Sequence, residues 1–153
     1  MEDRQEIRIV KFEEIYAEAA VRMWRASKKK AIGMDETHSF EDHVNFLKEV
    51  LVEDNNVYLA LDSDTCRVVG LMVTDGEYLN QLYIHNDYQR RGIGSRLLDQ
   101  AKARSSGSLR LYTFVVNQGA RAFYEDRGFR IIEFGNDNEE GLADILYEWS
   151  NCA

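Results

Sequence analysis

The spacing of apolar residues changes along this chain, and that change narrows the folds it can adopt. In the first third, apolar side chains recur every three or four positions, which is typical of helices that bury one face. Further on they form short runs or alternate with polar residues, as in strands, and Asp75-Gly76 is a strong hairpin signal. Two later segments return to helical spacing. The predicted strands are 7–10, 57–61, 67–73, 78–84, 109–116, 129–134 and 145–149, and the predicted helices are 13–30, 39–52, 91–104 and 117–127.

The order of these elements predicts the architecture. The first predicted helix carries one apolar stripe, formed by Ile15, Ala19, Met23 and Ala26. The second begins at Ser39, a residue type favoured at helix N-caps. Three hairpin-linked strands followed by strand–helix–strand crossovers predict an α/β (α+β) fold, with a mixed, mostly antiparallel sheet of about seven strands and helices on both faces. The length of 153 residues fits a single domain spanning 1–153.

Composition excludes several classes of protein. The net charge of -8 argues against a general nucleic-acid binder, which would usually be basic. No apolar run approaches the roughly 20 residues of a membrane span, and the charged start at Met1 lacks the apolar core of a signal peptide. Cys66 and Cys152 are too few for a secreted disulfide framework. We therefore expect a cytoplasmic protein without a nucleic-acid or membrane partner.

The charge is distributed unevenly. The window from Tyr88 to Arg121 contains seven basic residues and a single acid, Asp99, so it carries a charge of +6. The remainder of the chain then carries -14. One reading is a solvated helix face. The other is a local site for an anionic ligand, with acidic surroundings that suit a cationic second partner.

A glycine-containing loop lies inside this basic window. The predicted strand 78–84 leads into Gln89-Arg-Arg-Gly-Ile-Gly-Ser95, which opens a predicted helix. Unpaired amides and the dipole at a helix N-terminus attract phosphate, and glycines let it approach the backbone. The sequence lacks the nucleotidase pattern G-x-x-x-x-G-K-[ST], and Leu97 replaces the third glycine of the dinucleotide fingerprint. The loop thus predicts pyrophosphate binding, with a flexible turn as the alternative.

Two segments resemble the GNAT superfamily of N-acetyltransferases. Gln89-Arg-Arg-Gly-Ile-Gly94 is similar to its acetyl-CoA loop Q-x-x-G-x-G, and 117–129 is similar to its block N-x-x-A-x-x-F-Y-E-x-x-G-F. Asn86 departs from the family, in which many members have proline there. The resemblance implies acetyl-CoA as cosubstrate and no metal. The cofactor-binding residues that it implies are Leu82, Tyr83, Ile84, Gln89, Arg90, Arg91, Gly92, Ile93, Gly94, Ser95, Asn117 and Tyr124.

The resemblance also implies catalytic roles. Tyr124 corresponds to the tyrosine that protonates the leaving thiolate, although a packing role on the helix is the simpler alternative. Glu77 lies near the position where several members have a glutamate base, and a solvated hairpin residue is the alternative. Glu139 and Glu140, in the loop before the last strand, are rivals for the base, as is ordered water. We expect Asn117 both to cap its helix and to hold the cofactor.

The implied reaction is direct attack of a primary amine on the thioester in a ternary complex. The alternatives are a catalytically silent CoA-binding regulatory or interaction module and a different nucleotide binder. The acidic remainder favours a small cationic amine or a peptide amine as acceptor. Position in the fold places Trp24, His38, Glu139 and Glu140 at the acceptor site. Exposed sheet edges would allow a homodimer.

Overall fold

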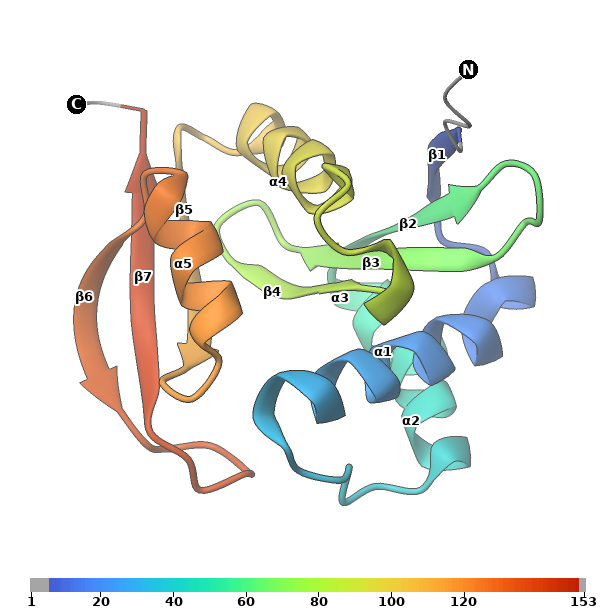
Figure 1. Cartoon of the computed structure of the whole chain (residues 1–153), viewed down its shortest axis with the longest axis horizontal. Helices are drawn as coiled ribbons and strands as arrows, with labels where there is room; N and C mark the ends of the chain where they lie inside the picture. The colour runs from blue at the N-terminus through green and yellow to red at the C-terminus, as the bar shows by residue number, and fades with distance from the viewer. Residues whose placement is uncertain (1–5, 152–153) are drawn as a thin grey trace.

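The computed structural model describes residues 6–151, so the predictions about the N-terminal start and Cys152 fall outside the described residues. It contains seven strands, five α-helices and three short helices of other types (Figure 1). The strands are β1 Ile7–Lys11, β2 Asn56–Asp62, β3 Val68–Thr74, β4 Leu79–Ile84, β5 Ser108–Phe114, β6 Arg130–Gly135 and β7 Asp144–Ser150. The helices are η1 Glu14–Tyr16, α1 Ala17–Ile32, α2 Phe40–Phe46, η2 Leu47–Leu51, α3 Val52–Asp54, η3 Asn86–Tyr88, α4 Ile93–Arg104 and α5 Gln118–Asp126.

The seven strands divide into two antiparallel groups. One group has the order β1-β2-β3-β4 and the other has the order β5-β7-β6. They meet where Tyr78 and Arg110 form a parallel bridge and the Arg110 amide donates to the Glu77 carbonyl at 2.9 Å. Beyond this junction β4 and β5 separate, and Figure 1 shows the two groups spreading apart. The sheet predicted as one unit is therefore divided in two. A wedge opens between β4 and β5, the neighbouring strands of the two groups.

Helices cover both faces of the four-stranded group, as the sequence predicted. Figure 1 shows α4 on one side of this sheet and α1 with α2 on the other. Alternate residues of β2 point to opposite faces. Tyr58 and Ala60 pack with α4 and α5, whereas Val57, Leu59 and Leu61 pack with α1 and α2. These two apolar clusters hold α4 on one face of the sheet and α1 on the other.

The predicted apolar stripe of α1 is wrong in its register. Ile15 is 85% exposed, and Ala19 and Ala26 also face solvent, so only Met23 of the predicted stripe is buried. The chain enters the helix through the short 3-10 turn η1, which leaves Ile15 outside the packed face. The face that α1 buries consists of Ala17, Ala20, Val21, Met23, Trp24 and Ser27.

The second predicted helix is present but irregular. Ser39 caps it, because its side chain accepts a hydrogen bond from the Asp42 amide at 3.1 Å. The α-helix then widens into π geometry at Leu47–Leu51 before a last α-turn. Val44, Leu47 and Leu51 are buried against α1 and the sheet, as predicted. Within residues 6–151 no helix has the length and apolarity that a membrane crossing requires.

Candidate functional site

The glycine loop forms a concave backbone turn in front of α4. Arg90 and Gly92 both adopt left-handed conformations, with φ of 64° and 83°, and Gly92 is the N-cap of α4. The amides of Ile93, Gly94 and Ser95, in the first helical turn, have no acceptor within the helix. Left-handed turns and free amides of this kind form anion-binding hollows, aided by the helix dipole. The predicted phosphate loop therefore has the geometry of an anion site.

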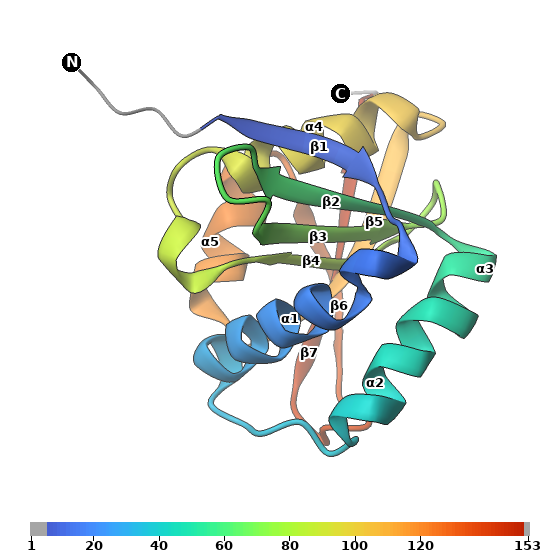
Figure 2. The same cartoon turned by 90° about the vertical axis from the view of Figure 1, so that its right-hand side faces the viewer.

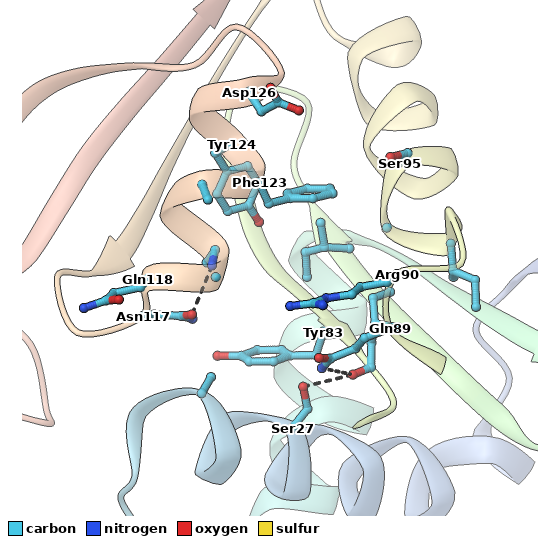
Figure 3. A pocket seen from close by; sticks show the side chains of 18 of the residues that line it. Ser27, Tyr83, Gln89, Arg90, Ser95, Asn117, Gln118, Phe123, Tyr124 and Asp126 are labelled. Atoms are coloured by element: carbon cyan, nitrogen blue, oxygen red, sulfur yellow. Dashed lines mark hydrogen bonds between the residues drawn. The ribbon is translucent and has the colours of Figure 1, made fainter. Parts of the chain in front are cut away.

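Side-chain hydrogen bonds hold this loop against the rest of the fold. The Gln89 Nε2 group donates to the Ile84 carbonyl at 3.2 Å, and the Ser27 hydroxyl donates to the same carbonyl at 3.1 Å (Figure 3). The Tyr88 hydroxyl donates to the buried Asp62 carboxylate at 2.7 Å. The Gln89 side-chain amide thus closes the loop onto the end of β4, and its predicted role in binding the cofactor stays a prediction.

The edge of β4 that faces the wedge offers free backbone amides. The His85 amide donates to the Val69 carbonyl at 2.8 Å, so alternate residues of β4 direct their amides toward β3. This alternation turns the Tyr83 amide toward β3 and the Leu82 and Ile84 amides toward the wedge. Of the three predicted cofactor-binding residues of β4, Leu82 and Ile84 therefore present an amide to the wedge and Tyr83 does not, because alternate amides of a strand cannot face the same side.

A cavity of about 1000 Å³ extends from the glycine loop into the wedge. All the predicted cofactor-binding residues line it except Arg91, whose guanidinium lies 5.0 Å from the centre of the Tyr88 ring. Asn117 lines the cavity and also caps α5, since its Oδ1 accepts from the Ala120 amide at 3.1 Å (Figure 3). The structure thus brings together, around one cavity, residues that lie in two separate sequence blocks.

Other lining residues were not predicted. Arg127 donates to the Ser95 hydroxyl at 3.1 and 2.8 Å and to the Phe123 carbonyl at 3.0 Å, and it joins α5 to the first turn of α4. Its position in the second sequence block, directly before the left-handed Gly128, is the sequence signal that could have identified it. Lys30 of α1 also lines the cavity, and no local sequence signal marks it, because α1 reaches the site through tertiary packing.

Tyr124 lies in the wedge, beside residues of β4 and β5. Its ring packs edge-on against Phe123 and Phe129, with ring centres 5.2 and 5.4 Å apart, and the residue is 7% exposed. Burial raises the pKa of the Tyr124 phenol, which therefore keeps its proton at neutral pH. Tyr124 lines the large cavity and also a second cavity of about 60 Å³, bordered by β4 and β5. The two cavities share five lining residues, which are Leu82, Tyr83, Asn117, Ala120 and Tyr124.

Glu77 does not reach either cavity. It is exposed in the turn between β3 and β4, where its backbone amide donates to the Asp75 carboxylate at 2.9 Å. It is five positions before Leu82, about 16 Å along an extended strand. It lies before β4, in the hairpin turn. Its role as general base stays a prediction, and its surroundings do not support that role.

The predicted acceptor-site residues occupy different environments. Trp24 is 5% exposed and stacks on Tyr83 with ring centres 5.9 Å apart, so its indole belongs to the core. His38 and Glu139 are exposed and contact each other, with 3.2 Å between Nε2 and a carboxylate oxygen. Glu140 is paired with Lys28 at 2.9 Å. The two glutamates therefore already have cationic or hydrogen-bonding partners within the chain.

His43 is buried beside Trp24, with ring centres 4.3 Å apart. Burial lowers the pKa of His43 to about 4, and the charges of Arg25 and Lys28 act in the same direction, whereas Glu36 opposes them. His43 is therefore neutral at pH 7. Across residues 6–151, no three His, Cys, Asp or Glu side chains are grouped so that they could hold a metal ion.

Comparisons with known proteins agree with this geometry. The family model for the acetyltransferase (GNAT) domain matches residues 53–131. The chain is 31% identical over 121 residues to the peptidyl-lysine N-acetyltransferase YjaB of Salmonella typhimurium, covering 74% of this chain and 77% of YjaB.

Solved structures share the fold. Apo YjaB from Escherichia coli superposes with a TM-score of 0.76 at 18% identity, over 94% of this chain and 97% of that one. The PaiA N-acetyltransferase of Thermoplasma acidophilum, in complex with coenzyme A, gives 0.72 at 21% identity, over 95% and 99%. The chain belongs to the GNAT family of acetyltransferases and is an acyltransferase.

Proposed function

We propose that this protein transfers the acetyl group of acetyl-CoA to a primary amine by direct attack within a ternary complex. One observation carries the proposal: Tyr124 lines both the large cavity, which reaches the glycine loop, and the small cavity bordered by β4 and β5. A donor in the large cavity and an amine in the small one would meet beside its phenol. Within residues 6–151 no cysteine lines either cavity, which argues against an acyl-enzyme intermediate.

The residues around the large cavity fit acetyl-CoA. The free amides of the first α4 turn would hold the pyrophosphate, with Arg90, Lys30 and Arg127 supplying positive charge nearby. The Leu82 and Ile84 amides would hold the pantetheine arm along the open edge of β4. The bound cosubstrate supplies a thioester carbon that an amine can attack.

Tyr124 would then assist the departure of the thiolate. A cysteine-like thiol has a pKa of about 8.5, well below that of a buried phenol, so full proton transfer from Tyr124 would be uphill. We therefore assign Tyr124 the role of a hydrogen-bond donor that stabilises the developing negative charge on sulfur. The raised pKa of Tyr124 favours this role, because the phenol stays protonated across the physiological range.

The amine must lose its proton before it attacks. A lysine side chain of pKa about 10.4 is neutral in only about one molecule in 2,500 at pH 7. The Glu140 charge acts on the Tyr83 phenol, whereas the exposed Glu77 lines neither cavity, so Glu140 or an ordered water is our candidate for the base. We propose that deprotonation takes place on this side of the wedge.

A peptidyl lysine is our first candidate for the acceptor. The name of the Salmonella relative gives that substrate class, and the charge of -14 outside the 88–121 window favours a cationic amine. The test is continuous measurement of thiol release from acetyl-CoA with lysine peptides, polyamines and amino acids. Initial rates that intersect in double-reciprocal plots against both substrates support the ternary complex. Parallel lines, or no release with any amine, would contradict the proposal.

A further inference from the structure

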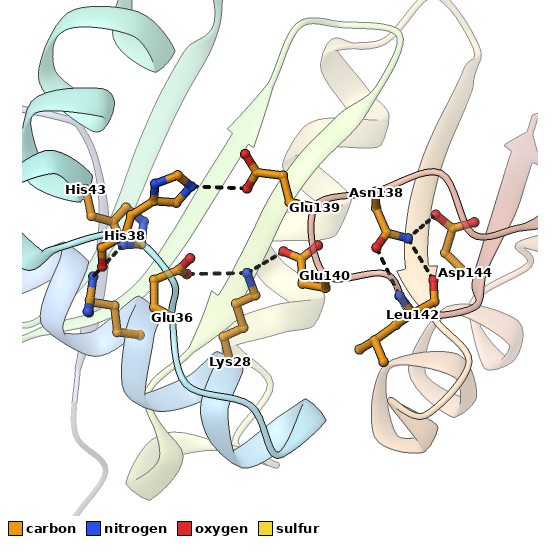
Figure 4. Close-up of polar contacts among 10 residues, drawn as sticks. Lys28, Glu36, His38, His43, Asn138, Glu139, Glu140, Leu142 and Asp144 are labelled. Carbon is orange, nitrogen blue, oxygen red and sulfur yellow. Dashed lines mark hydrogen bonds and ion pairs between the residues drawn. The ribbon is translucent and has the colours of Figure 1, made fainter.

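A buried group of charges joins two loops that are far apart in the sequence. The Lys28 ammonium, on α1, lies 2.9 Å from a Glu140 oxygen and 3.4 Å from a Glu36 oxygen (Figure 4). Glu36 belongs to the loop between α1 and α2, and Glu140 belongs to the loop between β6 and β7. We call these three residues the Lys28 triad. The triad links segments 112 residues apart.

The triad is sheltered from solvent. Its side chains are 15% exposed for Lys28, 10% for Glu36 and 18% for Glu140. Burial alone would lower the pKa of Lys28, but the hydrogen bond and charges of its partners raise it overall. Burial would likewise raise the pKa of Glu36, but the Lys28 charge lowers it overall. Because these charges are partly desolvated, removing Lys28 would leave two neighbouring carboxylates without their counter-charge.

The neighbouring lysine provides a contrast. Lys29 pairs with Asp35 at 2.8 Å, from the next position of the same helix to the same loop, but these side chains are 63% and 81% exposed. Exposed ion pairs contribute little to stability, because water and salt screen them. Lys28 and Lys29 therefore differ mainly in burial and in contact with the β6–β7 loop.

The β6–β7 loop is held in shape by hydrogen bonds among its own residues. The Asn138 side-chain amide donates to the Leu142 carbonyl at 2.8 Å and to the Asp144 carboxylate at 3.0 Å (Figure 4). The Leu142 amide donates back to Asn138 Oδ1 at 3.2 Å. These bonds shape the loop but do not attach it to α1. Attachment across the wedge comes from Glu140 in the triad and from the exposed contact of Glu139 with His38.

The triad borders the acceptor side of the wedge. The β6–β7 loop ends beside the cavity lining, because the Val115 amide donates to the Ala143 carbonyl at 2.9 Å and the next two residues, Val116 and Asn117, line the large cavity. Ser27, next to Lys28 on α1, lines it too. The charges of Lys28, Glu36 and Glu140 also act on the phenol of Tyr83, whose pKa burial raises. Tyr83 lines both the large and the small cavity. A shift of the β6–β7 loop would therefore change the surroundings of an acceptor without changing the phosphate loop on the other side of β4.

We infer that Lys28 is a positioning residue for the acceptor: through Glu140 it holds the β6–β7 loop as a fixed wall of the acceptor site. The inference rests on the proposed function. Lys28 itself need not touch the acceptor. Its ammonium occupies the space between two carboxylates and keeps the loop that carries one of them next to α1.

The kinetic test compares Lys28→Met with Lys29→Met. Lys28→Met is expected to raise KM for the amine acceptor about tenfold, while KM for acetyl-CoA stays within about twofold of the parent value. Lys29→Met is expected to leave both constants unchanged. Glu140→Gln, on the loop, should reproduce the Lys28→Met result without disturbing the helix. Equal acceptor KM values for all three variants would overturn the inference.

A second readout does not depend on catalysis. Amide hydrogen exchange in residues 136–143, measured without acceptor, should accelerate several-fold in Lys28→Met and in Glu140→Gln but not in Lys29→Met. The reversed pair Lys28→Glu with Glu140→Lys keeps one cation and two carboxylates in the group, with an ion pair between positions 28 and 140, and should restore slow exchange at least in part. Unchanged exchange in Lys28→Met would overturn the inference even if acetyl transfer is active. Absence of any acetyl transfer by the parent protein would instead contradict the proposed function.

Discussion

The two sides of the β4–β5 wedge are built in different ways. The donor side, around the first turn of α4, is basic, and its shape comes mainly from backbone: left-handed turns, free helix amides and an open strand edge. The acceptor side, around Lys28, is made of side chains from loops, with charges paired across more than 100 residues of sequence. Figure 2 shows α1 and α2 together on one side of the β1–β4 strands, with α4 on the other.

This difference indicates how each side recognises its ligand. A backbone hollow at a helix N-terminus suits a group common to many substrates, such as a pyrophosphate, because it makes no demand on side-chain identity. Loop side chains can be replaced without disturbing the sheet, which lets an acceptor site vary on a constant scaffold. The four predictions below test this division, from the largest expected effect to the smallest.

The first prediction concerns the residue shared by both sides. Tyr124→Phe should lower kcat by about 10- to 100-fold, because it removes the hydrogen bond to the leaving sulfur while keeping the ring. Steady-state kinetics with saturating acetyl-CoA and acceptor would measure it. Tyr147→Phe is the control, since Tyr147 is a buried tyrosine that lines neither cavity and whose hydroxyl donates to Glu125. Equal kcat values for the two variants would remove Tyr124 from the mechanism.

The second prediction concerns the pH stability of the acceptor side. Because His43 has a pKa of about 4 in the folded protein and about 6.5 when unfolded, the unfolded state binds more protons between these values. The His43 contribution is therefore fully present above pH 6.5 and is lost as pH falls toward 4. We expect a loss of about 2 kcal/mol between pH 7 and pH 4.5.

Urea unfolding at both pH values would measure this loss. The matched variant is His43→Phe, which keeps an aromatic ring against Trp24 but cannot titrate. It should lose less stability than the parent protein over the same interval. The depressed pKa of Glu36 acts in the same direction at lower pH in both proteins, so the difference between them isolates His43. An identical loss in both proteins would refute the prediction.

The third prediction concerns the donor side. Arg127→Met should weaken acetyl-CoA binding about tenfold, because charge-assisted hydrogen bonds between α5 and the first turn of α4 are lost. The KM for the acceptor should stay nearly constant. Arg130→Met is the control, since Arg130 is exposed and 3.9 Å from its carboxylate partner. A change in acceptor KM as large as the change in acetyl-CoA affinity would contradict the proposed division between the two sides.

The fourth prediction is the smallest. Glu77→Gln should change kcat/KM by less than about twofold at every pH, because an exposed carboxylate about 16 Å along the strand from Leu82 cannot contact the amine. The pH–rate profile from pH 6 to 9 is the measurement. A basic limb that disappears in Glu77→Gln would restore the predicted role of Glu77 as general base.

The donor side could be predicted from sequence because its signals are local. A strand, a loop with two glycines and a helix start within about twenty residues leave little freedom for the backbone. The caps at Ser39 and Asn117 were predicted for the same reason, since an N-cap depends on residues three positions apart. The orientation of the Tyr83 amide was not predicted, because the side to which each amide of β4 points depends on which neighbouring strand β4 pairs with.

The acceptor side required the tertiary structure. No spacing pattern connects Lys28 with Glu140. From the sequence alone, Glu139 and Glu140 were predicted only as residues of the acceptor site and as rivals for the general base. The register of α1, which decides that Trp24 is buried and Lys28 faces the loop, followed from packing against β3 and β4 and not from its apolar stripe.

The sequence by itself therefore determined the order of elements, the phosphate loop and the family, because these depend on residues near one another in the chain. The tertiary structure alone decided the splitting of the sheet, the position of Tyr124 between two cavities and the charge pairing of the acceptor loops. The physical reason is that long-range ion pairs and strand separation depend on packing between distant segments. Those contacts form only when the whole chain is folded.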